Sequence, residues 1–372
     1  MRESGSLAAA NAAARAFAGP APVGALAPLG SGLIHQTFAA PLGGAPAHEL
    51  VLQRLNTKIF AQPHALMRNL ERITEHLRES RRAEGSSDLA RRVLEVLHTS
   101  DGSALFEDAE GGLWRAFPRI VDGVALGSNR DPARLTSAAR AFGDYAQRLA
   151  TLPGPPLLET LPHFHDFARR RRAFDAAVAA DPHSRAADAG AVLDALRRAC
   201  EALERALPEA TVDALPRRIA HHDCKLDNLL FDVRSGEALC VLDLDTSMPG
   251  RLLSDFGELV RSATTSGADE SDASSVRFDQ DAFSALACGY LRELANTLTP
   301  AERETLPLAG ARMALMNAVR FATDHLEGDI YFRLLQPGQN LERARTQLAL
   351  TEAMLAAEDE LRERLVRASV EL

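Results

Sequence analysis

The stretch His221-His222-Asp223-Cys224-Lys225-Leu226-Asp227-Asn228 has the form H-x-D-x-K-x-x-N, and Asp243 follows fifteen residues after Asn228. ATP-dependent phosphoryl transfer needs such side chains. A carboxylate accepts the proton of the attacking hydroxyl, a cation lies against the phosphoryl oxygens, and an amide oxygen and a second carboxylate hold Mg²⁺. The pattern therefore indicates this chemistry; the alternative is a solvated turn rich in His and Asp.

The residues after this stretch predict a β-hairpin. A short apolar strand is expected at 229–231, a turn at 232–236 and a returning strand at 238–242. A hairpin of this size brings its two ends together. Asp243 is therefore expected to return close to Asp223 and Asn228, around one space of the size of a metal ion.

Composition limits the class of protein. A length of 372 residues with 46% apolar and 25% charged residues predicts a globular protein of two or three domains. The net charge of −9 argues against a nucleic-acid partner, which would require a basic face. The N-terminus lacks the apolar core of a signal peptide, and no apolar stretch is long enough to span a membrane.

The cysteines indicate the compartment. Cys200, Cys224, Cys240 and Cys288 are scattered and form no C-x-x-C pair. This spacing is typical of reduced thiols in a cytoplasmic protein, and it fits neither a disulfide framework nor a zinc site. We expect a cytoplasmic monomer.

A second candidate binding element lies near the N-terminus. Residues 25–38 are apolar on both sides of a small-residue loop, which predicts a hairpin whose tip contains Gly30 and Gly32. Glycines at such a tip let backbone N–H groups approach a nucleotide phosphate closely. The alternative is an ordinary turn. The chain contains no G-x(4)-G-K-[ST] motif, so a Walker-type ATPase is not expected.

The next strand carries a candidate cation. Residues 49–55 read as a strand that contains Arg54, at the place where a kinase-like lobe carries the cation for the α/β-phosphates. The alternative is an edge-strand arginine in solvent. An amphipathic helix is predicted at 63–82, from which Glu71 or Glu75 could face Arg54.

The remaining pattern predicts strands first and then mainly helices. Further strands are expected at 93–97 and 113–117, and a hinge at 118–123. We therefore predict an N-terminal nucleotide-binding lobe at 1–120 and a C-terminal catalytic and substrate-binding lobe at 121–372. The expected helices are 134–152, 164–180, 189–207, 281–294, 301–326 and 341–366, with a mobile acidic loop at 266–275.

Taken in chain order, these motifs resemble those of the aminoglycoside phosphotransferase/choline kinase superfamily. More narrowly, the sequence is similar to the N-acetylhexosamine 1-kinases. The matching blocks are 30–38, 52–57 with Phe60, 65–67, 163–166, 221–228, 242–246, 248–250, 255–257, 320–324 and 326–332.

The resemblance implies an α+β, bilobal protein-kinase-like fold with a small β-rich N-terminal lobe and a larger helical C-terminal lobe. It also implies transfer of the γ-phosphate of ATP to the anomeric hydroxyl of a sugar, with Mg²⁺. Asp223 matches the catalytic carboxylate of the family and Lys225 the lysine near the γ-phosphate. Asn228 and Asp243 match its Mg²⁺ ligands. Arg320 and Tyr331 match positions that contact the sugar.

The glycine loop departs from the pattern of the N-acetylhexosamine kinases. That family is expected to have histidine at the position of Leu33 and Asn-Asp at His35-Gln36. The acceptor could therefore also be an aminoglycoside, a neutral hexose or another small alcohol. Choline is disfavoured, because one Trp and three Tyr supply no aromatic cage.

Several of these residues have a structural alternative. Arg320 and Asp324 are spaced as a surface ion pair on a helix, and an isolated Tyr331 is more often a core residue. Asp255 is expected to cap a helix and to brace the catalytic loop, together with His221. Asp245 reads either as an aid to the metal site or as a solvated carboxylate.

Other features have competing functional or structural interpretations. His163 and His165 lie too close in sequence to face one metal, and 169–172 reads as a solvated basic face. Asp243-Leu244-Asp245 could serve as the D-x-D motif of a glycosyltransferase, but the helical C-terminal half supplies no nucleotide-sugar domain. A non-catalytic pseudokinase is disfavoured, because the base, the lysine and both metal ligands are present.

Overall fold

The computed structural model describes residues 2–30, 34–44, 48–127, 130–265 and 273–370. By their contacts these residues form two compact units. The first unit comprises Met1–Val124, Thr151–Pro162 and Leu230–Met248, and the second comprises Ala125–Ala150, His163–Leu229 and Pro249–Leu372. Two later segments thus belong to the first unit, and the functional lobes at 1–120 and 121–372 stay a prediction.

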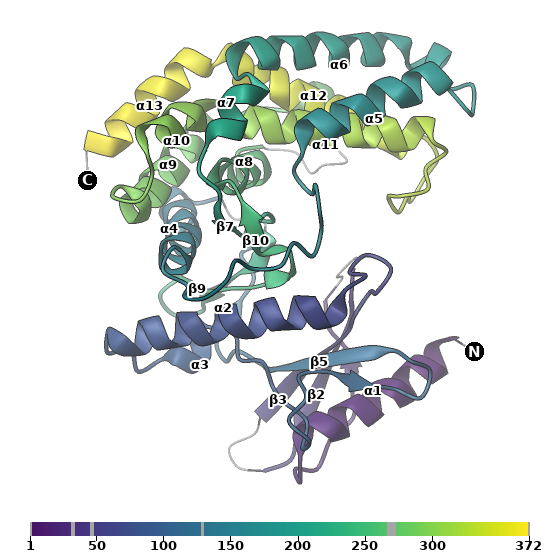
Figure 1. Ribbon diagram of the computed structural model, residues 1–372, viewed down its shortest axis with the longest axis vertical. Coiled ribbons are helices and arrows are strands. Elements are labelled where there is room, and N and C mark those ends of the chain that lie inside the picture. Colours follow the sequence, from purple (N-terminus) through teal and green to yellow (C-terminus); the bar gives the residue numbers. More distant parts are fainter. Residues whose placement is uncertain (1, 31–33, 45–47, 128–129, 266–272, 371–372) are drawn as a thin grey trace. The chain divides into compact units, whose positions relative to one another are not determined.

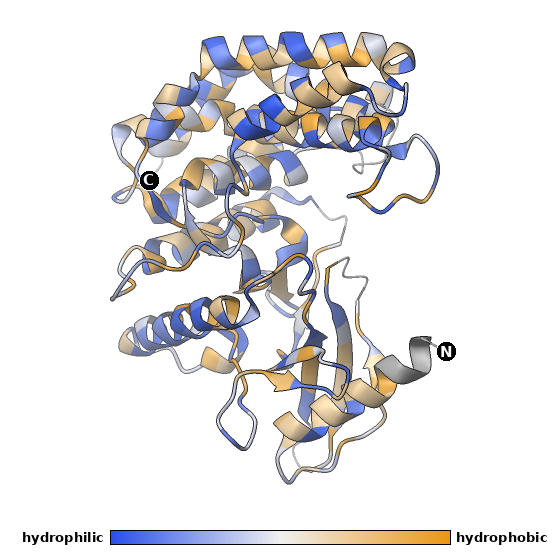
Figure 2. Ribbon diagram, turned by 45° about the vertical axis from the view of Figure 1, so that its right-hand side comes forward, coloured by the Kyte–Doolittle hydropathy of each residue, from blue (hydrophilic) through white to orange (hydrophobic). Residues whose placement is uncertain are grey.

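The first unit is built on a five-stranded antiparallel sheet. Its strand order is β1 (Ala27–Pro28), β2 (Gln36–Leu42), β3 (His48–Arg54), β5 (Leu113–Pro118) and β4 (Phe106–Glu107). Helix α1 (Arg2–Ala18) packs against this sheet (Figure 1). Its buried residues, from Ala10 to Phe17, form one core with Leu52 and Trp114, and Figure 2 shows α1 largely in hydrophobic colours. The predicted strands 49–55 and 113–117 are confirmed.

The two faces of the sheet have different roles. Side chains alternate between faces along a strand, and Leu50 and Leu52 of β3 lie in the core beneath α1. Arg54 has the same parity and is in register with Trp114, which also lies in this core. Gln53 and Arg115, which are in register with each other, therefore point to the opposite face.

The rest of the first unit confirms one prediction and corrects another. The predicted helix is present as α2 (Pro63–Ala83) and is followed by α3 (Leu89–Arg92). The strand predicted at 93–97 is wrong, because the segment does not form a continuous ladder of backbone hydrogen bonds with a neighbouring strand. The segment is extended, and its one backbone bond to β5 runs from Leu97 N to Ala116 O (3.0 Å).

The predicted hairpin is confirmed. Strands β8 (Leu229–Asp232) and β9 (Ala238–Val241) form a three-stranded sheet with β6 (Gly123–Val124). The carboxylate of Asp232 accepts hydrogen bonds from the N–H groups of Arg234 and Ser235 and so closes the turn. The hairpin delivers the chain to Asp243, which belongs to the first unit.

The second unit is mainly helical. Helix α11 is buried along most of its length and packs against α5, α6, α8 and α12 (Figure 1). Helices α4 and α9 form another tightly packed pair. The helices are α4 (Pro132–Leu149), α5 (Phe167–Ala180), α6 (Ala186–Ala206), α7 (Glu209–Ala214), α8 (Leu252–Ala263), α9 (Gln280–Leu294), α10 (Pro300–Thr305), α11 (Ala309–Leu326), α12 (Gln339–Ala356) and α13 (Glu358–Val370).

The predicted helices are largely confirmed, but two of them are divided. The helix predicted at 301–326 is interrupted by the 3-10 turn η4 (Leu306–Leu308), which contains Pro307; proline lacks the N–H that a continuous helix would use. The helix predicted at 341–366 breaks at Ala357 into α12 and α13. Most of the acidic loop predicted at 266–275 lies outside the described residues.

All four cysteines are free thiols, three of them buried. Among the described residues, no helix combines the length and the apolar character needed to cross a bilayer.

Candidate active site

The catalytic loop begins where β7 (Arg218–Ala220) ends, and β7 pairs with β10 (Met248–Gly250). His222 has a positive φ of 66°, an uncommon conformation for a residue with a side chain. Its ring packs against the backbone of Gly250, where an added Cβ would lie 2.1 Å from His222 Nε2. Glycine at 250 is therefore needed for this loop conformation.

Asp255 braces the loop from α8. Its two carboxylate oxygens accept hydrogen bonds from the backbone N–H groups of His221 and His222, each at 2.8 Å. The predicted brace is confirmed. The predicted cap is wrong, because α8 begins at Leu252 and Asp255 lies inside its first turn. Burial raises the pKa of Asp255 to about 7, against the opposing effect of the two N–H groups.

His221 is a second brace, as predicted. Its Nδ1 accepts a hydrogen bond from the N–H of Asp223 (3.2 Å). The buried ring lies edge-on against Phe142 and Tyr145, with centroids 5.5 Å away in both pairs. These contacts fix the backbone immediately before Asp223.

Three predicted site residues lie together in this loop. Lys225 Nζ is 2.9 Å from Asp223 Oδ2, and Asn228 Nδ2 is 2.7 Å from the same oxygen. Asn228 Nδ2 also donates to the backbone oxygen of Asp223 at 2.8 Å. Because the amide nitrogen is bound to Asp223, the oxygen Oδ1 is the atom of Asn228 that fits Mg²⁺, which prefers oxygen ligands.

The other predicted metal ligand lies in the first unit. Asp243 follows β9 with a positive φ of 53° and leads into the 3-10 turn η2 (Leu244–Thr246). Asp223 and Asn228 belong to the second unit, so the predicted convergence of the three around one ion stays a prediction. Non-glycine residues in this backbone region often lie at functional sites.

Asp245 is not a solvated carboxylate. It is 2% exposed, and its oxygens bind Arg115 Nη1 and Nη2 at 2.5 and 2.8 Å. Arg115 also donates to Gln53 Oε1 through Nε (2.9 Å) and Nη2 (2.7 Å), on the sheet face opposite to α1. The sequence interpretation missed this pair, although an arginine inside the apolar run 113–117 was the signal for it.

His35 completes the buried cluster. Its Nδ1 accepts the N–H of Asn56 (3.1 Å), so Nε2 carries the proton and donates to Asp245 Oδ2 (2.7 Å). Burial raises the pKa of Asp245, but Arg115 and His35 more than offset it and hold the pKa well below its ordinary value. His35, Arg115 and Asp245 thus tie the end of the glycine loop to the turn after Asp243.

Arg54 has different partners from those expected. Its Nη2 lies 3.7 Å from carboxylate oxygens of both Asp108 and Glu110, on the α1 side of the sheet. Pairing with Glu71 or Glu75 is wrong, because the charges nearest Arg54 on its own face are those of the β4–β5 turn. The predicted contact of Arg54 with nucleotide stays a prediction.

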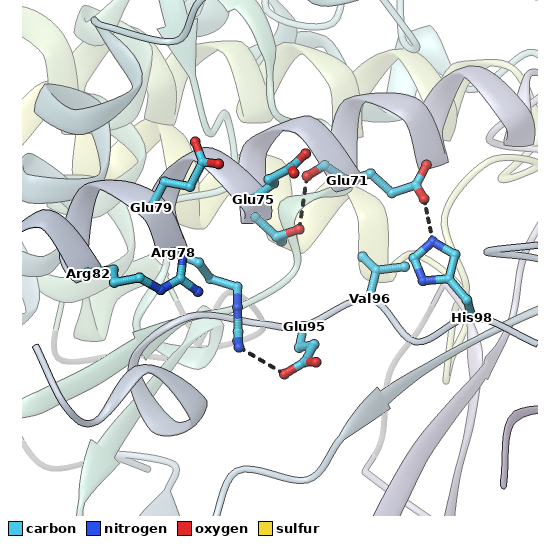
Figure 3. Close-up of a pocket in the computed structure, with 9 residues that line it drawn as sticks. Glu71, Glu75, Arg78, Glu79, Arg82, Glu95, Val96 and His98 are labelled. Carbon is cyan, nitrogen blue, oxygen red and sulfur yellow. Dashed lines mark hydrogen bonds and ion pairs between the residues drawn. The ribbon is translucent and has the colours of Figure 1, made fainter. Parts of the chain in front are cut away.

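Glu71 and Glu75 instead line a surface cavity of 410 Å³ in the first unit, between α2 and residues 95–98 (Figure 3). Glu71 binds His98 at 2.8 Å there, and Arg78 pairs with Glu95 at 3.0 Å.

Only part of the predicted glycine loop is described. Gly30 has a positive φ of 72°, and the N–H of Leu29 donates to Thr37 O (2.9 Å), as expected for a hairpin between β1 and β2. Gly32 and Leu33 lie outside the described residues. Nucleotide contact by Gly30 and Gly32 stays a prediction.

Arg320 and Tyr331 line one cavity of 160 Å³ in the second unit. The guanidinium carbon of Arg320 lies 5.8 Å from the ring centroid of Tyr331 and 5.3 Å from that of Phe332. Tyr331 is 66% exposed, so it is not a core residue. Arg170, which was expected on a solvated basic face, lines the same cavity.

The structural alternative, an ion pair between Arg320 and Asp324, is not what the structure has. Asp324 is buried, and its carboxylate accepts the backbone N–H groups of Ile330, Tyr331 and Phe332. Asn340 Nδ2 supplies a further hydrogen bond, of 2.7 Å. Asp324 therefore shapes the turn that presents Tyr331.

A chain of contacts links this cavity to the catalytic loop within the second unit. Arg170 Nη2 donates to Phe164 O (3.4 Å), and the ring of Phe164 stacks on His165 at 4.6 Å. His165 in turn lies 5.2 Å from the ring of His222, the neighbour of Asp223. His163 instead binds Asp166, so the two histidine rings face different neighbours.

Comparisons with known proteins agree with the fold. The model of the phosphotransferase enzyme family (APH) matches residues 25–287. An aminoglycoside phosphotransferase from Alicyclobacillus acidocaldarius has a TM-score of 0.56 at 14% identity, over 89% of this chain and 93% of that chain. The microcompartment-associated aminopropanol kinase has a TM-score of 0.55 at 17% identity, over 94% and 95%.

A third solved structure, the GDP complex of aminoglycoside 2′-phosphotransferase-IIIa, has a TM-score of 0.51 at 10% identity, over 91% of this chain and 93% of that chain. At such identities these structures support the α+β kinase-like fold, while the family match covers most of the chain. The chain therefore belongs to the phosphotransferase enzyme family and is a small-molecule kinase that transfers phosphate to a hydroxyl acceptor.

Proposed function

We propose that the protein is an ATP- and Mg²⁺-dependent kinase that phosphorylates the anomeric hydroxyl of a sugar. The observation that carries the kinase chemistry is the catalytic loop, in which Asp223 Oδ2 is held by Lys225 and Asn228. The sugar acceptor is supported by Arg320 and Tyr331, which border one cavity at the positions that resemble those of N-acetylhexosamine 1-kinases. We further expect a cytoplasmic monomer.

The proposed mechanism assigns one task to each residue. Asp223 orients the acceptor hydroxyl and takes its proton, while the braces at His221 and Asp255 keep the carboxylate in place. Lys225 exchanges its bond with Asp223 for the oxygens of the transferring phosphoryl group. Asn228 Oδ1 and the carboxylate of Asp243 would hold Mg²⁺, which neutralises phosphate charge when bound. Most of the rate enhancement comes from positioning and electrostatics, because the transition state of phosphoryl transfer is loose.

Asp223→Asn tests the assigned base. Turnover should fall by about 10²–10⁴-fold or more, because the amide cannot take the proton, while ATP affinity should change little. ADP release would be measured with a panel of sugars, and ³¹P NMR of the product identifies the phosphorylated position. Asp227→Asn is the matched control, because Asp227 lies in the same loop with an exposed side chain. An Asp223→Asn enzyme with full activity would contradict the proposal.

A double-mutant cycle tests the proposed metal site. If Asn228 and Asp243 bind one ion, Asn228→Ala and Asp243→Ala should each weaken Mg²⁺-dependent nucleotide binding. The combined loss should be smaller than the sum of the two, because the second change removes a ligand from a site already lost. Additive losses would indicate separate roles. ATP and GTP should both be titrated, since one solved relative is a GDP complex.

A further inference from the structure

The cavity lined by Arg320 and Tyr331 contains two arginine side chains that phosphoryl transfer does not require. Arg170 and Arg320 both line it. Arg170 donates to a backbone oxygen and Arg320 to Asn317 Oδ1 (3.2 Å), and within the described ranges neither forms an ion pair. Arg170 Nε is buried without a hydrogen-bond partner. Two guanidinium groups thus share one small cavity without a carboxylate bound to either.

Two carboxylates, those of Asp324 and Glu327, line the same cavity, but within the described residues neither forms an ion pair with these arginines. The oxygens of Asp324 accept the N–H groups of the 330–332 turn and the amide of Asn340. Glu327 is exposed at the rim. A ligand can therefore supply the charge that the cavity lacks.

The pKa shifts in this neighbourhood agree with repulsion between the two arginines. Burial lowers the pKa of Arg170, and the nearby charge of Arg320 lowers it further. Burial also lowers the pKa of His165 well below its ordinary value, with added effects of His222, Arg320 and Arg170. Arg170 and Arg320 therefore repel each other, and an anion bound by both would relieve the repulsion.

We propose that the acceptor carries an anionic group, a carboxylate or a phosphate, in addition to its reacting hydroxyl, and that Arg170 and Arg320 bind this group. This inference rests on the proposed function, because it names the substrate class of the same site. Guanidinium groups match the planar geometry of carboxylates and phosphates through paired N–H donors. Tyr331 and Phe332 supply apolar surface for the carbon skeleton, and the Phe164–His165–His222 contacts link the cavity to the catalytic loop.

Matched acceptors test the inference. Glucose, glucuronic acid and glucose 6-phosphate differ at one carbon only, and galactose with galacturonic acid repeats the comparison. The charged acceptors should exceed the neutral ones at least about tenfold in kcat/KM, mainly through KM, as expected when a charged hydrogen bond is added. The carboxylate and phosphate arms show which anion is preferred. Binding would also be measured by calorimetry with these acceptors, independently of turnover.

Variants assign the effect to the two arginines. Arg320→Gln and Arg170→Gln should each reduce the ratio of kcat/KM for the charged acceptor to that for its matched neutral acceptor by about 10–100-fold. Arg320→Lys retains the charge without the paired donors and should lose part of the preference. Arg172→Gln is the matched control, since Arg172 lies on the same helix but is exposed and outside the cavity.

The outcomes separate the two proposals. If neutral sugars are phosphorylated as well as charged ones and Arg320→Gln and Arg320→Lys change neither, the inference is overturned while the sugar kinase stands. If no acceptor releases ADP but glucuronic acid or glucose 6-phosphate binds the wild type and not Arg320→Gln, the anion site at Arg170 and Arg320 is supported and the sugar-kinase proposal fails.

Discussion

Two buried carboxylates, Asp245 in the first unit and Asp255 in the second, each hold a loop that presents a predicted site residue. Asp245 follows Asp243 in its turn, and Asp255 fixes the backbone before Asp223. Both are 2% exposed. Their charge states nevertheless differ, because Arg115 and His35 keep the pKa of Asp245 low whereas burial raises that of Asp255 to about 7.

The difference shows that a counter-charge, rather than the number of hydrogen bonds, decides whether a buried carboxyl group ionises. Asp255 accepts two good backbone hydrogen bonds and is still half protonated near neutral pH. Asp245 has a guanidinium at contact distance and stays charged. We therefore expect substitutions of Asp245 and of Asp255 to differ in how much they lower the free energy of unfolding and in how that loss depends on pH.

Asp245→Asn should have the largest effect. It leaves Arg115 charged, buried and without its partner, which should lower the free energy of unfolding by about 3–5 kcal/mol. Urea denaturation measures this loss. Asp194→Asn is the control, because Asp194 is 64% exposed and pairs with Arg197 at 3.5 Å, so it should cost less than about 1 kcal/mol. Equal losses of stability for the two variants would show that the buried pair of Asp245 and Arg115 matters no more than an exposed ion pair.

Asp255→Asn should have the second-largest effect. Both oxygens of Asp255 accept a backbone N–H, so the amide NH₂ of asparagine must face one of these donors. A loss of about 1–3 kcal/mol and a lower kcat are expected. Asp279→Asn is the control, since Asp279 caps α9 with one oxygen for two N–H groups and asparagine caps equally well. Wild-type kcat in Asp255→Asn would show that the brace does not position Asp223.

The dependence of stability on pH gives the smallest and sharpest comparison. The pKa of Asp255 rises from 3.8 in the unfolded chain to about 7, so the folded state alone binds this proton between those values. The contribution of Asp255 to the free energy of unfolding should therefore fall as pH rises towards 7, by at most about 1.4 kcal/mol per pH unit. The pKa of Asp245 is lowered, so its contribution to the free energy of unfolding should be constant at pH values above the ordinary aspartate pKa. That contribution should fall only in more acidic solution.

Urea denaturation of the wild type and of Asp255→Asn between pH 5 and 8 checks this slope. The stability difference between them should shrink with rising pH and level off above 7. Parallel curves would mean that Asp255 does not titrate in this range.

The sequence predicted the elements that local pattern determines. Helix α2 follows from the helical spacing of Leu66, Leu70, Ile73 and Leu77, and the hairpin after the catalytic loop from two apolar runs around a turn. The segment 93–97 has the same apolar character as a strand, but strand formation also needs a ladder of backbone hydrogen bonds to a neighbouring strand. The segment bonds β5 from Leu97 N to Ala116 O without forming such a ladder, and sequence pattern does not reveal this.

The candidate site was predictable where its residues are close in sequence. Asp223, Lys225 and Asn228 lie within six positions and meet through short-range hydrogen bonds. The partners of Asp245 could not be derived this way, since Arg115 is 130 positions away and His35 is 210. The ion-pair partner of Arg54 was predicted wrongly, because the strand alternation that turns it towards α1 became clear only from the register with Trp114.

The distance between Arg115 and Asp245 along the chain has a consequence for biosynthesis. A ribosome that adds about 5–20 residues per second needs roughly 7–26 s to pass from one to the other, a span of 130 residues. During that interval the nascent sheet carries an arginine on one face without its carboxylate. The first unit cannot complete its contacts until Met248 has been made, and a nascent polypeptide halted before that point would remain a substrate for chaperones.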